Sequence, residues 1–171
     1  MKISTSMRAV IALTLICMIT AAALAGINYA TAPIIEQAEL EKETAALRQV
    51  LPTGESFGDP IDTASLGLDS RITAVYREGN GEGYVFRITV KGYKSGLTVL
   101  CGIGSDGSVK GATCLSSSET LGHEKTYGDR FKGTDISSVR TVDTVSGATL
   151  TTKAYREAIE LALAAYEILN K

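Results

Sequence analysis

Tyr84-Val85-Phe86-Arg87-Ile88-Thr89-Val90 is the stretch that decides the fold, because its side chains alternate along the chain. Such alternation is typical of a β-strand with one buried face. A similar run at residues 72–76 precedes it. Residues 97–103 and 108–115 follow, on either side of the hairpin signal Ser105-Asp106-Gly107. Strands that succeed one another in this way predict a small antiparallel sheet.

The carboxy-terminal segment, residues 152–169, predicts a helix. Its apolar side chains fall on one stripe at helical spacing: Tyr155, Ala158, Ile159, Ala162, Tyr166 and Leu169. We expect this stripe, its two tyrosines included, to pack on the sheet. Between sheet and helix we expect a loop-rich region at residues 116–133 and a short strand at residues 139–142.

That short strand would deliver the segment Asp143-Thr144-Val145-Ser146-Gly147-Ala148-Thr149 to the start of the helix. Ser146, Gly147 and Ala148 are small, so a bulky partner can reach the backbone. The first amides of the helix and its dipole would favour an anion such as a phosphate beside Thr149. An ordinary turn followed by a helix N-cap fits the same residues.

The segment resembles the flavin-attachment motif of the FMN-binding domain family. That family includes the G subunit of the Rnf complex and the C subunit of the sodium-pumping NADH:quinone reductase. The resemblance implies that a flavin transferase joins FMN to Thr149 through a phosphoester bond, with Asp143 opening the motif. It also implies that the residues around the acceptor line the cofactor site: Ser146, Gly147, Ala148, Leu150 and Thr151.

A second loop of this family usually reads Glu-Thr-Pro-Gly-Leu-Gly and lies against the flavin. The corresponding residues here are Glu119, Thr120, Leu121 and Gly122, so the Pro-Gly pair is missing. Tyr93 resembles an aromatic residue of a further family loop, although a strand-ending aromatic is the alternative. Lys153 either pairs with the phosphate as a point charge or is a solvated lysine at the helix start. His123, the one histidine, is expected to be exposed in its loop.

The amino-terminal segment, residues 9–32, has no charged residue and is rich in Ala, Leu and Ile. As a helix it would cross a hydrocarbon core of about 30 Å, which predicts a transmembrane helix. Lys2 and Arg8 precede it, so residues 1–8 are expected in the cytoplasm. A cleaved signal peptide is the alternative, because Ala23-Leu24-Ala25 fits a cleavage pattern.

The regions after this helix complete the expected organisation. Residues 33–52 predict a connecting helix, and residues 53–171 an extracytoplasmic FMN-binding domain. The fold class is α+β: a small antiparallel sheet with a packing carboxy-terminal helix, preceded by one transmembrane helix.

Other chemistry finds little support in the sequence. The net charge of −2 gives no basic field for nucleic acid. No catalytic residue set is expected, and with a single histidine no metal site is expected. In the expected hairpin Cys101 faces the region near Lys110, and Cys114 faces the region near Leu97. The two cysteines would then lie several residues apart along the ladder, too far for a disulfide.

The resemblance implies a membrane-anchored flavoprotein subunit of an Rnf-type complex in the cell membrane. It would relay electrons through covalent FMN during ferredoxin–NAD electron transfer coupled to Na⁺ or H⁺ movement. Its partners would be the membrane subunits and the Fe–S and flavin subunits of the complex, and the flavin transferase. The alternatives are the C subunit of a Na⁺-pumping NADH:quinone reductase, a stand-alone flavinylated carrier, or a non-catalytic membrane-tethered binding or scaffold domain.

Overall fold

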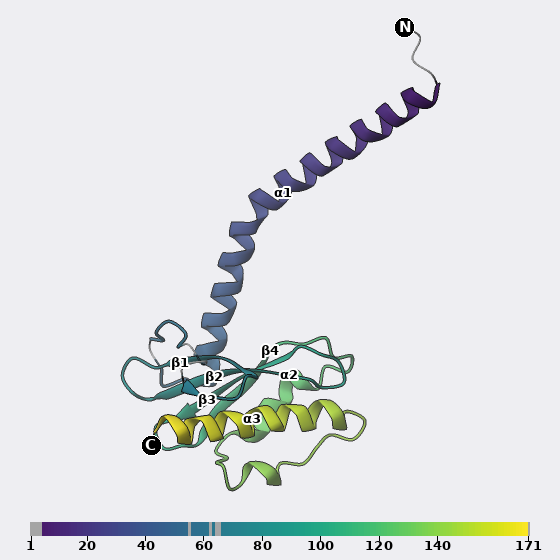
Figure 1. Ribbon diagram of the computed structural model, residues 1–171. Helices are drawn as coiled ribbons and strands as arrows, with labels where there is room; N and C mark the ends of the chain where they lie inside the picture. The colour runs from purple at the N-terminus through teal and green to yellow at the C-terminus, as the bar shows by residue number, and fades with distance from the viewer. Residues whose placement is uncertain (1–4, 55, 62, 64–65, 171) are drawn as a thin grey trace. The chain divides into compact units, whose positions relative to one another are not determined.

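The computed structural model describes residues 5–54, 56–61, 63 and 66–170. The chain divides into two compact units, residues 1–42 and 43–171. Figure 1 shows a long helix, a sheet and a carboxy-terminal helix, which confirms the α+β class.

The long helix α1 spans Thr5–Val50. It contains Pro33, so the expected transmembrane and connecting helices form one continuous element. Proline removes one backbone hydrogen bond without obliging a helix to end, which explains the difference. The helix is long and apolar enough to cross a membrane, with a mean hydropathy of 2.5 over its most apolar window. Three of its threonine hydroxyls donate to carbonyls of the same helix, those of Thr14, Thr20 and Thr31. Such bonding satisfies polar side chains in a lipid environment.

The sheet has four antiparallel strands in the order β1-β2-β3-β4, as expected. Their bounds are Ile72–Arg77, Gly83–Val90, Leu97–Gly104 and Val109–Ser116. Part of the preceding loop pairs with the outer edge at Phe57↔Glu78 and Ile61↔Val75. This pairing covers backbone groups that an edge strand would otherwise expose.

Helix α3, Thr149–Leu169, covers one face of the sheet (Figure 1). Its expected stripe is confirmed, since Tyr155, Ala158, Ile159 and Ala162 are fully buried and Tyr166 packs against the same core. The core on this side also contains aromatic and branched residues of the sheet, such as Phe86.

The opposite face of the sheet packs against the last residues of α1 and the residue that follows it. Leu47, Val50 and Leu51 are buried there. Gly102 and Gly111 are cross-strand partners beneath them. A Cβ on Gly102 would lie 2.3 Å from the Val50 carbonyl oxygen, so only glycine permits this approach.

A charged contact reinforces the same attachment. The Glu43 carboxylate accepts hydrogen bonds from the Tyr76 hydroxyl at 2.6 Å and from Arg87 Nη1 at 2.8 Å. Residues 43–51 therefore pack with the folded domain, and the predicted boundary at residue 53 remains a proposal.

The region between sheet and α3 differs from expectation. Residues 116–133 contain the short helices α2, Glu124–Tyr127, and η2, Gly128–Phe131. Tyr127 and Phe131 are four residues apart and both pack on Tyr155, with ring centroids 5.6 and 5.9 Å away. Burial of these two rings stabilises the two short helices in a region that was expected to be a loop.

The expected strand at residues 139–142 is wrong: Val139–Thr141 forms the 3-10 helix η3. Asp135 Oδ1 accepts hydrogen bonds from the amides of Ser137 and Ser138, and the Asp135 carbonyl accepts one from Val139. These bonds close a helical turn, so Val139 is buried without any strand partner.

Cys101 and Cys114 are free in the structure, and the hairpin register differs from the expected one. Cys101 pairs with Ala112, and Cys114 with Val99, because the ladder has irregularities at both ends. The two cysteines are therefore two ladder positions apart, rather than several. Diagonal neighbours in a sheet are about 7–8 Å apart, which is still too far for a relaxed disulfide.

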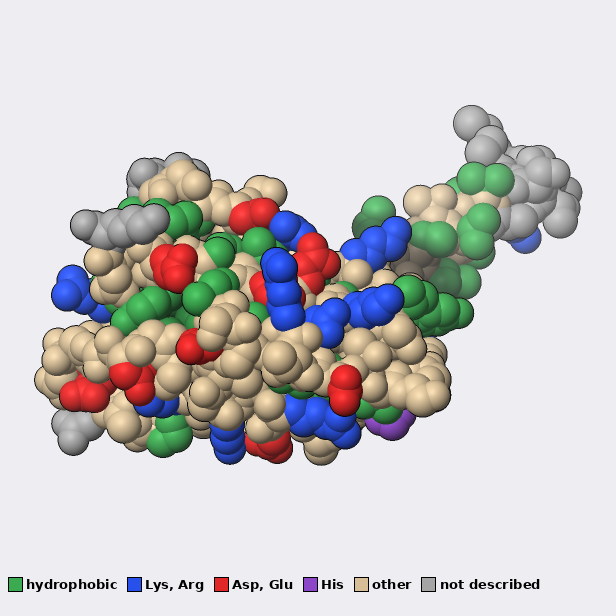
Figure 2. Space-filling model, turned by 90° about the horizontal axis from the view of Figure 1, so that it is seen from below, with side chains coloured by type: hydrophobic (Ala, Val, Ile, Leu, Met, Phe, Trp, Pro, Cys, Tyr) green, Lys and Arg blue, Asp and Glu red, His purple; other side chains and the backbone are tan. Residues whose placement is uncertain are grey.

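Acidic and basic side chains are interspersed on the face of the molecule seen in Figure 2. Three exposed carboxyl groups have pKa values lowered from 3.8 to about 2 by hydrogen bonds. The donors are Arg71 for Asp69, Lys110 and Ser108 for Asp106, and Ser137 and Ser138 for Asp135.

These shifts predict a pH dependence of stability. A lowered folded-state pKa stabilises the fold above the unfolded value, and this contribution disappears as the pH falls from 3.8 to about 2. We expect the thermal midpoint of the whole chain in detergent to fall in this window. The fall should be modest because the groups are exposed and screened. A midpoint that is independent of pH there would contradict the prediction.

Candidate functional site

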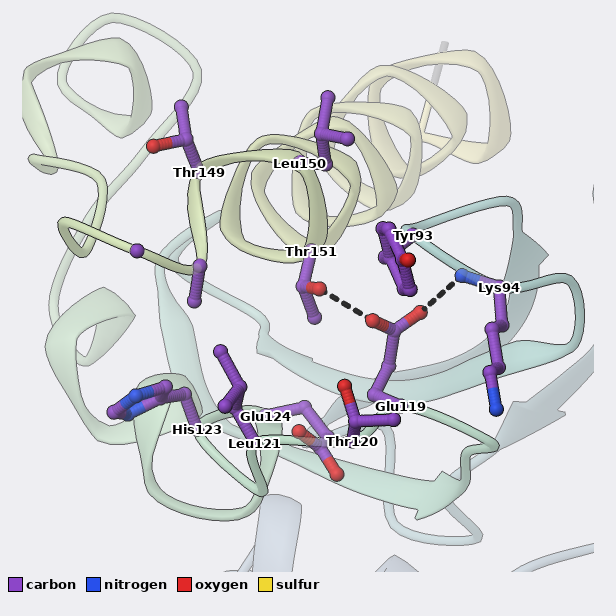
Figure 3. Close-up of a pocket in the computed structure, with 12 residues that line it drawn as sticks. Tyr93, Lys94, Glu119, Thr120, Leu121, His123, Glu124, Thr149, Leu150 and Thr151 are labelled. Carbon is purple, nitrogen blue, oxygen red and sulfur yellow. Dashed lines mark hydrogen bonds between the residues drawn. The ribbon is translucent and has the colours of Figure 1, made fainter.

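A cavity of about 600 Å³ opens beside the amino terminus of α3. Three segments form its walls (Figure 3): the loop after β2, the loop after β4 with the start of α2, and residues 147–151. The lining residues are Tyr93, Lys94, Glu119, Thr120, Leu121, His123, Glu124, Gly147, Ala148, Thr149, Leu150 and Thr151. A cavity of this size is within the usual range for a small-molecule or cofactor site.

One wall is a helix start without a side-chain cap. Gly147 has a φ of +82°, a left-handed conformation that favours glycine and turns the chain into α3. The N-cap residue is Ala148, whose side chain cannot accept a hydrogen bond. The first amides of a helix have no intrahelical partner and attract anions. Thr149 is the first residue of α3, and it is exposed beside these amides.

Glu119 joins the three walls. Its Oε1 accepts a hydrogen bond from the Lys94 amide at 3.0 Å, and its Oε2 accepts one from the Thr151 hydroxyl (Figure 3). A Cβ on Gly92 would lie 2.6 Å from Glu119 Oε1, so glycine allows the carboxylate to come this close. The carboxylate therefore fixes the loop after β2 against the start of α3.

The mouth of the cavity is apolar. Tyr93, Leu121 and Leu150 are 63%, 61% and 62% exposed, although each has a large apolar side chain. Apolar side chains grouped around a cavity are typical of a site that binds a partly apolar ligand. The site thus combines an anion-attracting helix start with apolar side chains suited to a planar ring system.

Most of the predicted site residues line this cavity: Tyr93, Glu119, Thr120, Leu121, Gly147, Ala148, Thr149, Leu150 and Thr151. Ser146, Gly122, Asp143 and Lys153 are outside its lining. Asp143 and Lys153 have exposed side chains. The cofactor contacts of all thirteen residues remain predictions.

Sequence reasoning missed Lys94 and Glu124 as lining residues and gave His123 no role. His123 is exposed, as expected, yet it lines the cavity. Glu124 is buried, and its Oε1 accepts a hydrogen bond from Ser117 Oγ at 2.8 Å. The sequence pointed to these residues only through their neighbours: Lys94 follows the predicted site residue Tyr93, and His123 follows the predicted site residue Gly122.

The position of Glu119 leads to a specific prediction. Glu119→Ala removes both bonds of the carboxylate, whereas Glu119→Gln keeps one acceptor and one polar group. We expect the free energy of unfolding of the alanine variant to be about 1–3 kcal/mol lower, as for other lost hydrogen bonds to charged groups. Urea unfolding of both variants measures this, with faster hydrogen exchange at the Lys94 amide as a local readout. Equal stability of the two variants would contradict the role assigned to the carboxylate.

Comparison with known proteins connects this cavity to a family. Residues 92–164 match the FMN-binding domain, and residues 1–50 match the RnfG N-terminal region. The chain is 30% identical to the G subunit of the Na(+)-translocating ferredoxin:NAD(+) oxidoreductase complex of Acetobacterium woodii. That alignment covers 93% of this chain and 90% of its relative. The chain belongs to the RnfG family.

Other members of the RnfG family are similar over much of their length. The G subunit of the ion-translocating oxidoreductase complex of Stutzerimonas stutzeri is 29% identical, over 90% of this chain and 77% of its own. That of Shewanella piezotolerans is 26% identical, over 80% and 77%. The FMN-binding match contains every lining residue of the cavity, and the RnfG N-terminal match ends at the last residue of α1.

Proposed function

We propose that this chain is the membrane-anchored flavoprotein subunit of an Rnf-type ion-translocating oxidoreductase complex, with FMN bound covalently to Thr149. The electrons would pass between ferredoxin and NAD, coupled to Na⁺ or H⁺ movement. One observation carries the proposal: the region that matches the FMN-binding domain holds a cavity with an exposed threonine at an uncapped helix start.

The residues present fit FMN. The first amides of α3 would hold the phosphate, because their partial positive charge is not used by a capping side chain. Tyr93, Leu121 and Leu150 would contact the isoalloxazine, and their exposed apolar surfaces would be covered by it. When bound, FMN would supply the electron-transfer chemistry.

The attachment needs an activated flavin, because free FMN and a hydroxyl would have to lose water. We infer that the flavin transferase uses a phosphoanhydride of FMN. The bond from the FMN phosphorus to the bridging oxygen breaks, and a bond to Thr149 Oγ forms. The second phosphate leaves with the bridging oxygen, and the hydroxyl proton passes to a base of the transferase or to water.

The anchor and the covalent bond serve one purpose in this proposal. The basic residues before the apolar segment favour a cytoplasmic amino terminus, so the domain would lie on the far side of the cell membrane. A phosphoester keeps FMN on a domain that has no access to the cytosolic pool. The helix limits the domain to the membrane surface, which raises its effective concentration near the other proteins of the complex.

Isolation of the chain from cells that contain the flavin transferase tests the proposal. Denatured protein should fluoresce under ultraviolet light, and its mass should exceed that of the polypeptide by FMN less one water. Peptide mapping should place the addition at Thr149. Colourless protein with an unmodified Thr149 would overturn the proposal and favour a binding or scaffold domain.

A further inference from the structure

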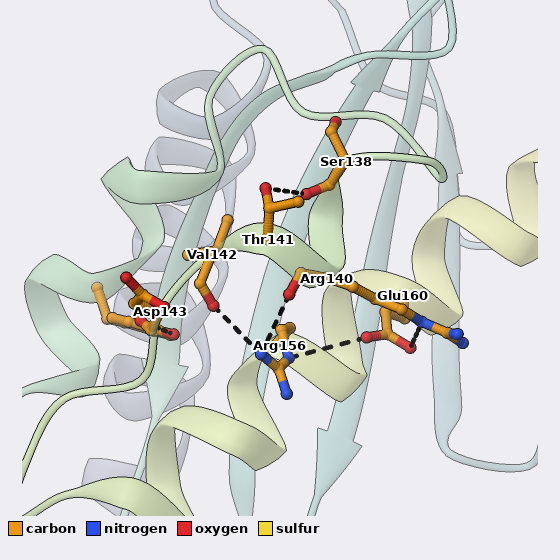
Figure 4. Close-up of polar contacts among 8 residues, drawn as sticks. Ser138, Arg140, Thr141, Val142, Asp143, Arg156 and Glu160 are labelled. Carbon is orange, nitrogen blue, oxygen red and sulfur yellow. Dashed lines mark hydrogen bonds and ion pairs between the residues drawn. The ribbon is translucent and has the colours of Figure 1, made fainter.

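The segment that leads to Thr149 is fixed to the folded core at three points of its backbone. The first is Arg156, one helical turn past Thr152 on α3. Its Nη1 donates hydrogen bonds to the Val142 carbonyl at 3.2 Å and the Arg140 carbonyl at 3.5 Å (Figure 4). Glu160 holds the guanidinium in place, with 3.8 Å between its Oε1 and Arg156 Nε.

The second point is Tyr127. Its hydroxyl donates a hydrogen bond to the Asp143 carbonyl at 2.9 Å. The ring is buried and packs edge-on against Phe131 and Tyr155, with centroids 5.3 and 5.6 Å away. The hydroxyl therefore has little freedom to move. It fixes the backbone at Asp143, one residue after the Val142 carbonyl that Arg156 binds.

The third point is Thr152. Its Oγ1 accepts a hydrogen bond from the Val145 amide at 3.3 Å and donates one to the Ala148 carbonyl at 2.9 Å. The Ala148 amide in turn donates to the Val145 carbonyl at 3.0 Å, which closes the turn around residues 146 and 147. Thr152 is fully buried, so this contact lies under the turn rather than on its surface.

Tyr127 and Thr152 hold this backbone from buried positions and Arg156 from a partly exposed one, whereas three polar side chains of the segment face solvent. Asp143, Ser146 and Thr149 are exposed. The segment is thus presented as an ordered surface with its hydroxyl and carboxylate groups toward solvent. An enzyme that modifies Thr149 would meet this surface already formed.

We propose that Arg156, Tyr127 and Thr152 are positioning residues that hold residues 142–148 in the conformation recognised by the flavin transferase. This inference rests on the proposed attachment of FMN to Thr149. If the contacts are lost, the segment samples several conformations and only a fraction of the molecules is competent to bind the enzyme. The apparent affinity of the enzyme for the chain is then its intrinsic affinity multiplied by the competent fraction. The rate of FMN transfer in the bound complex is unchanged.

Kinetics of FMN transfer to the unmodified full-length chain in detergent test this inference. Purified flavin transferase and its flavin donor are used, and the concentration of the chain is varied. Tyr127→Phe removes one hydroxyl and keeps the packed ring. Arg156→Gln removes both carbonyl contacts. Arg156→Lys keeps the positive charge but lacks the planar guanidinium group with its several N–H donors. We expect KM for the chain to rise about threefold to tenfold in Tyr127→Phe, the range for one lost hydrogen bond, with kcat unchanged. Arg156→Gln loses two hydrogen bonds, so its KM should rise at least as much. The lysine variant should be intermediate.

Arg140→Gln is the matched control. Arg140 also pairs with Glu160, and its side chain is 80% exposed. The control variant makes the same change of charge but leaves the carbonyl contacts of Arg156 in place, so its KM should equal that of the wild type. A second readout needs no enzyme: hydrogen exchange at the bonded amides of Val145 and Ala148 should be faster in Tyr127→Phe than in the control.

Each outcome supports or overturns a separate statement. Wild-type KM and wild-type exchange in Tyr127→Phe and Arg156→Gln overturn the positioning role and leave the attachment site intact. A lower kcat at constant KM also overturns it, since that assigns the residues to the chemical step. If the wild-type chain itself is not modified at Thr149, the proposed function fails together with the inference. If Arg156→Gln does not fold, Tyr127→Phe decides.

Discussion

Thr149→Ala should abolish the covalent flavin and leave the fold unchanged. The side chain of Thr149 is exposed, and surface substitutions away from packed contacts change stability by about 0.5 kcal/mol or less. The variant should therefore show no fluorescence on a denaturing gel and no added mass, with a wild-type thermal midpoint. Thr149→Ser keeps the hydroxyl and should still accept FMN.

Thr126→Ala is the control for this experiment, because it removes an exposed threonine that lies outside residues 142–148 and does not line the cavity. Its flavin content should match the wild type. Persistent fluorescence in Thr149→Ala would move the attachment to another residue and refute the assignment.

Gly128→Ala should have the largest effect on stability. A Cβ at this position would lie 2.0 Å from the Ala112 carbonyl oxygen and 2.6 Å from the Tyr155 hydroxyl. Strand β4 and the buried Tyr155 cannot both move away without disturbing the core, so we expect a loss of about 3 kcal/mol, at the upper end for overpacking. Urea unfolding of the whole chain in detergent measures this loss.

Gly58→Ala is the matched control for that prediction. A Cβ at Gly58 would have its nearest neighbour, the Arg77 carbonyl oxygen, at 3.9 Å, which is an ordinary contact. Its free energy of unfolding should change by about 0.5 kcal/mol or less. Similar losses in both variants would show that the contact with β4 and Tyr155 does not limit the position.

The parts of the fold that could be predicted well are those with a repeating pattern. The alternation of residues 84–90 and the stripe of α3 each reflect burial of one face, so the strands and the helix could be predicted from them. The turn at residues 139–141 has no such pattern. It forms because the Asp135 side chain binds two backbone amides, and a strand-like run of Val-Arg-Thr-Val conceals this.

The site divides in the same way. Residues 147–151 could be predicted to line it because they are contiguous and chemically distinctive. Glu124 could not, because it is buried at the start of α2 and bonds to Ser117, and no local pattern in the sequence predicts this arrangement. The departure of the Glu119 loop from the expected family pattern left its geometry open, and the contacts of Glu119 to Lys94 and Thr151 show how this loop is held.

The glycine pair of β3 and β4 has a practical consequence for producing the domain without its anchor. The backbone of Val50 packs directly on Gly102 and Gly111. A fragment that starts after Pro52 would therefore expose a trough of apolar side chains on this face of the sheet. Water-exposed surfaces of that kind promote self-association. A fragment for crystallography or spectroscopy should therefore begin before Glu43, so that its own first helical turns fill the trough.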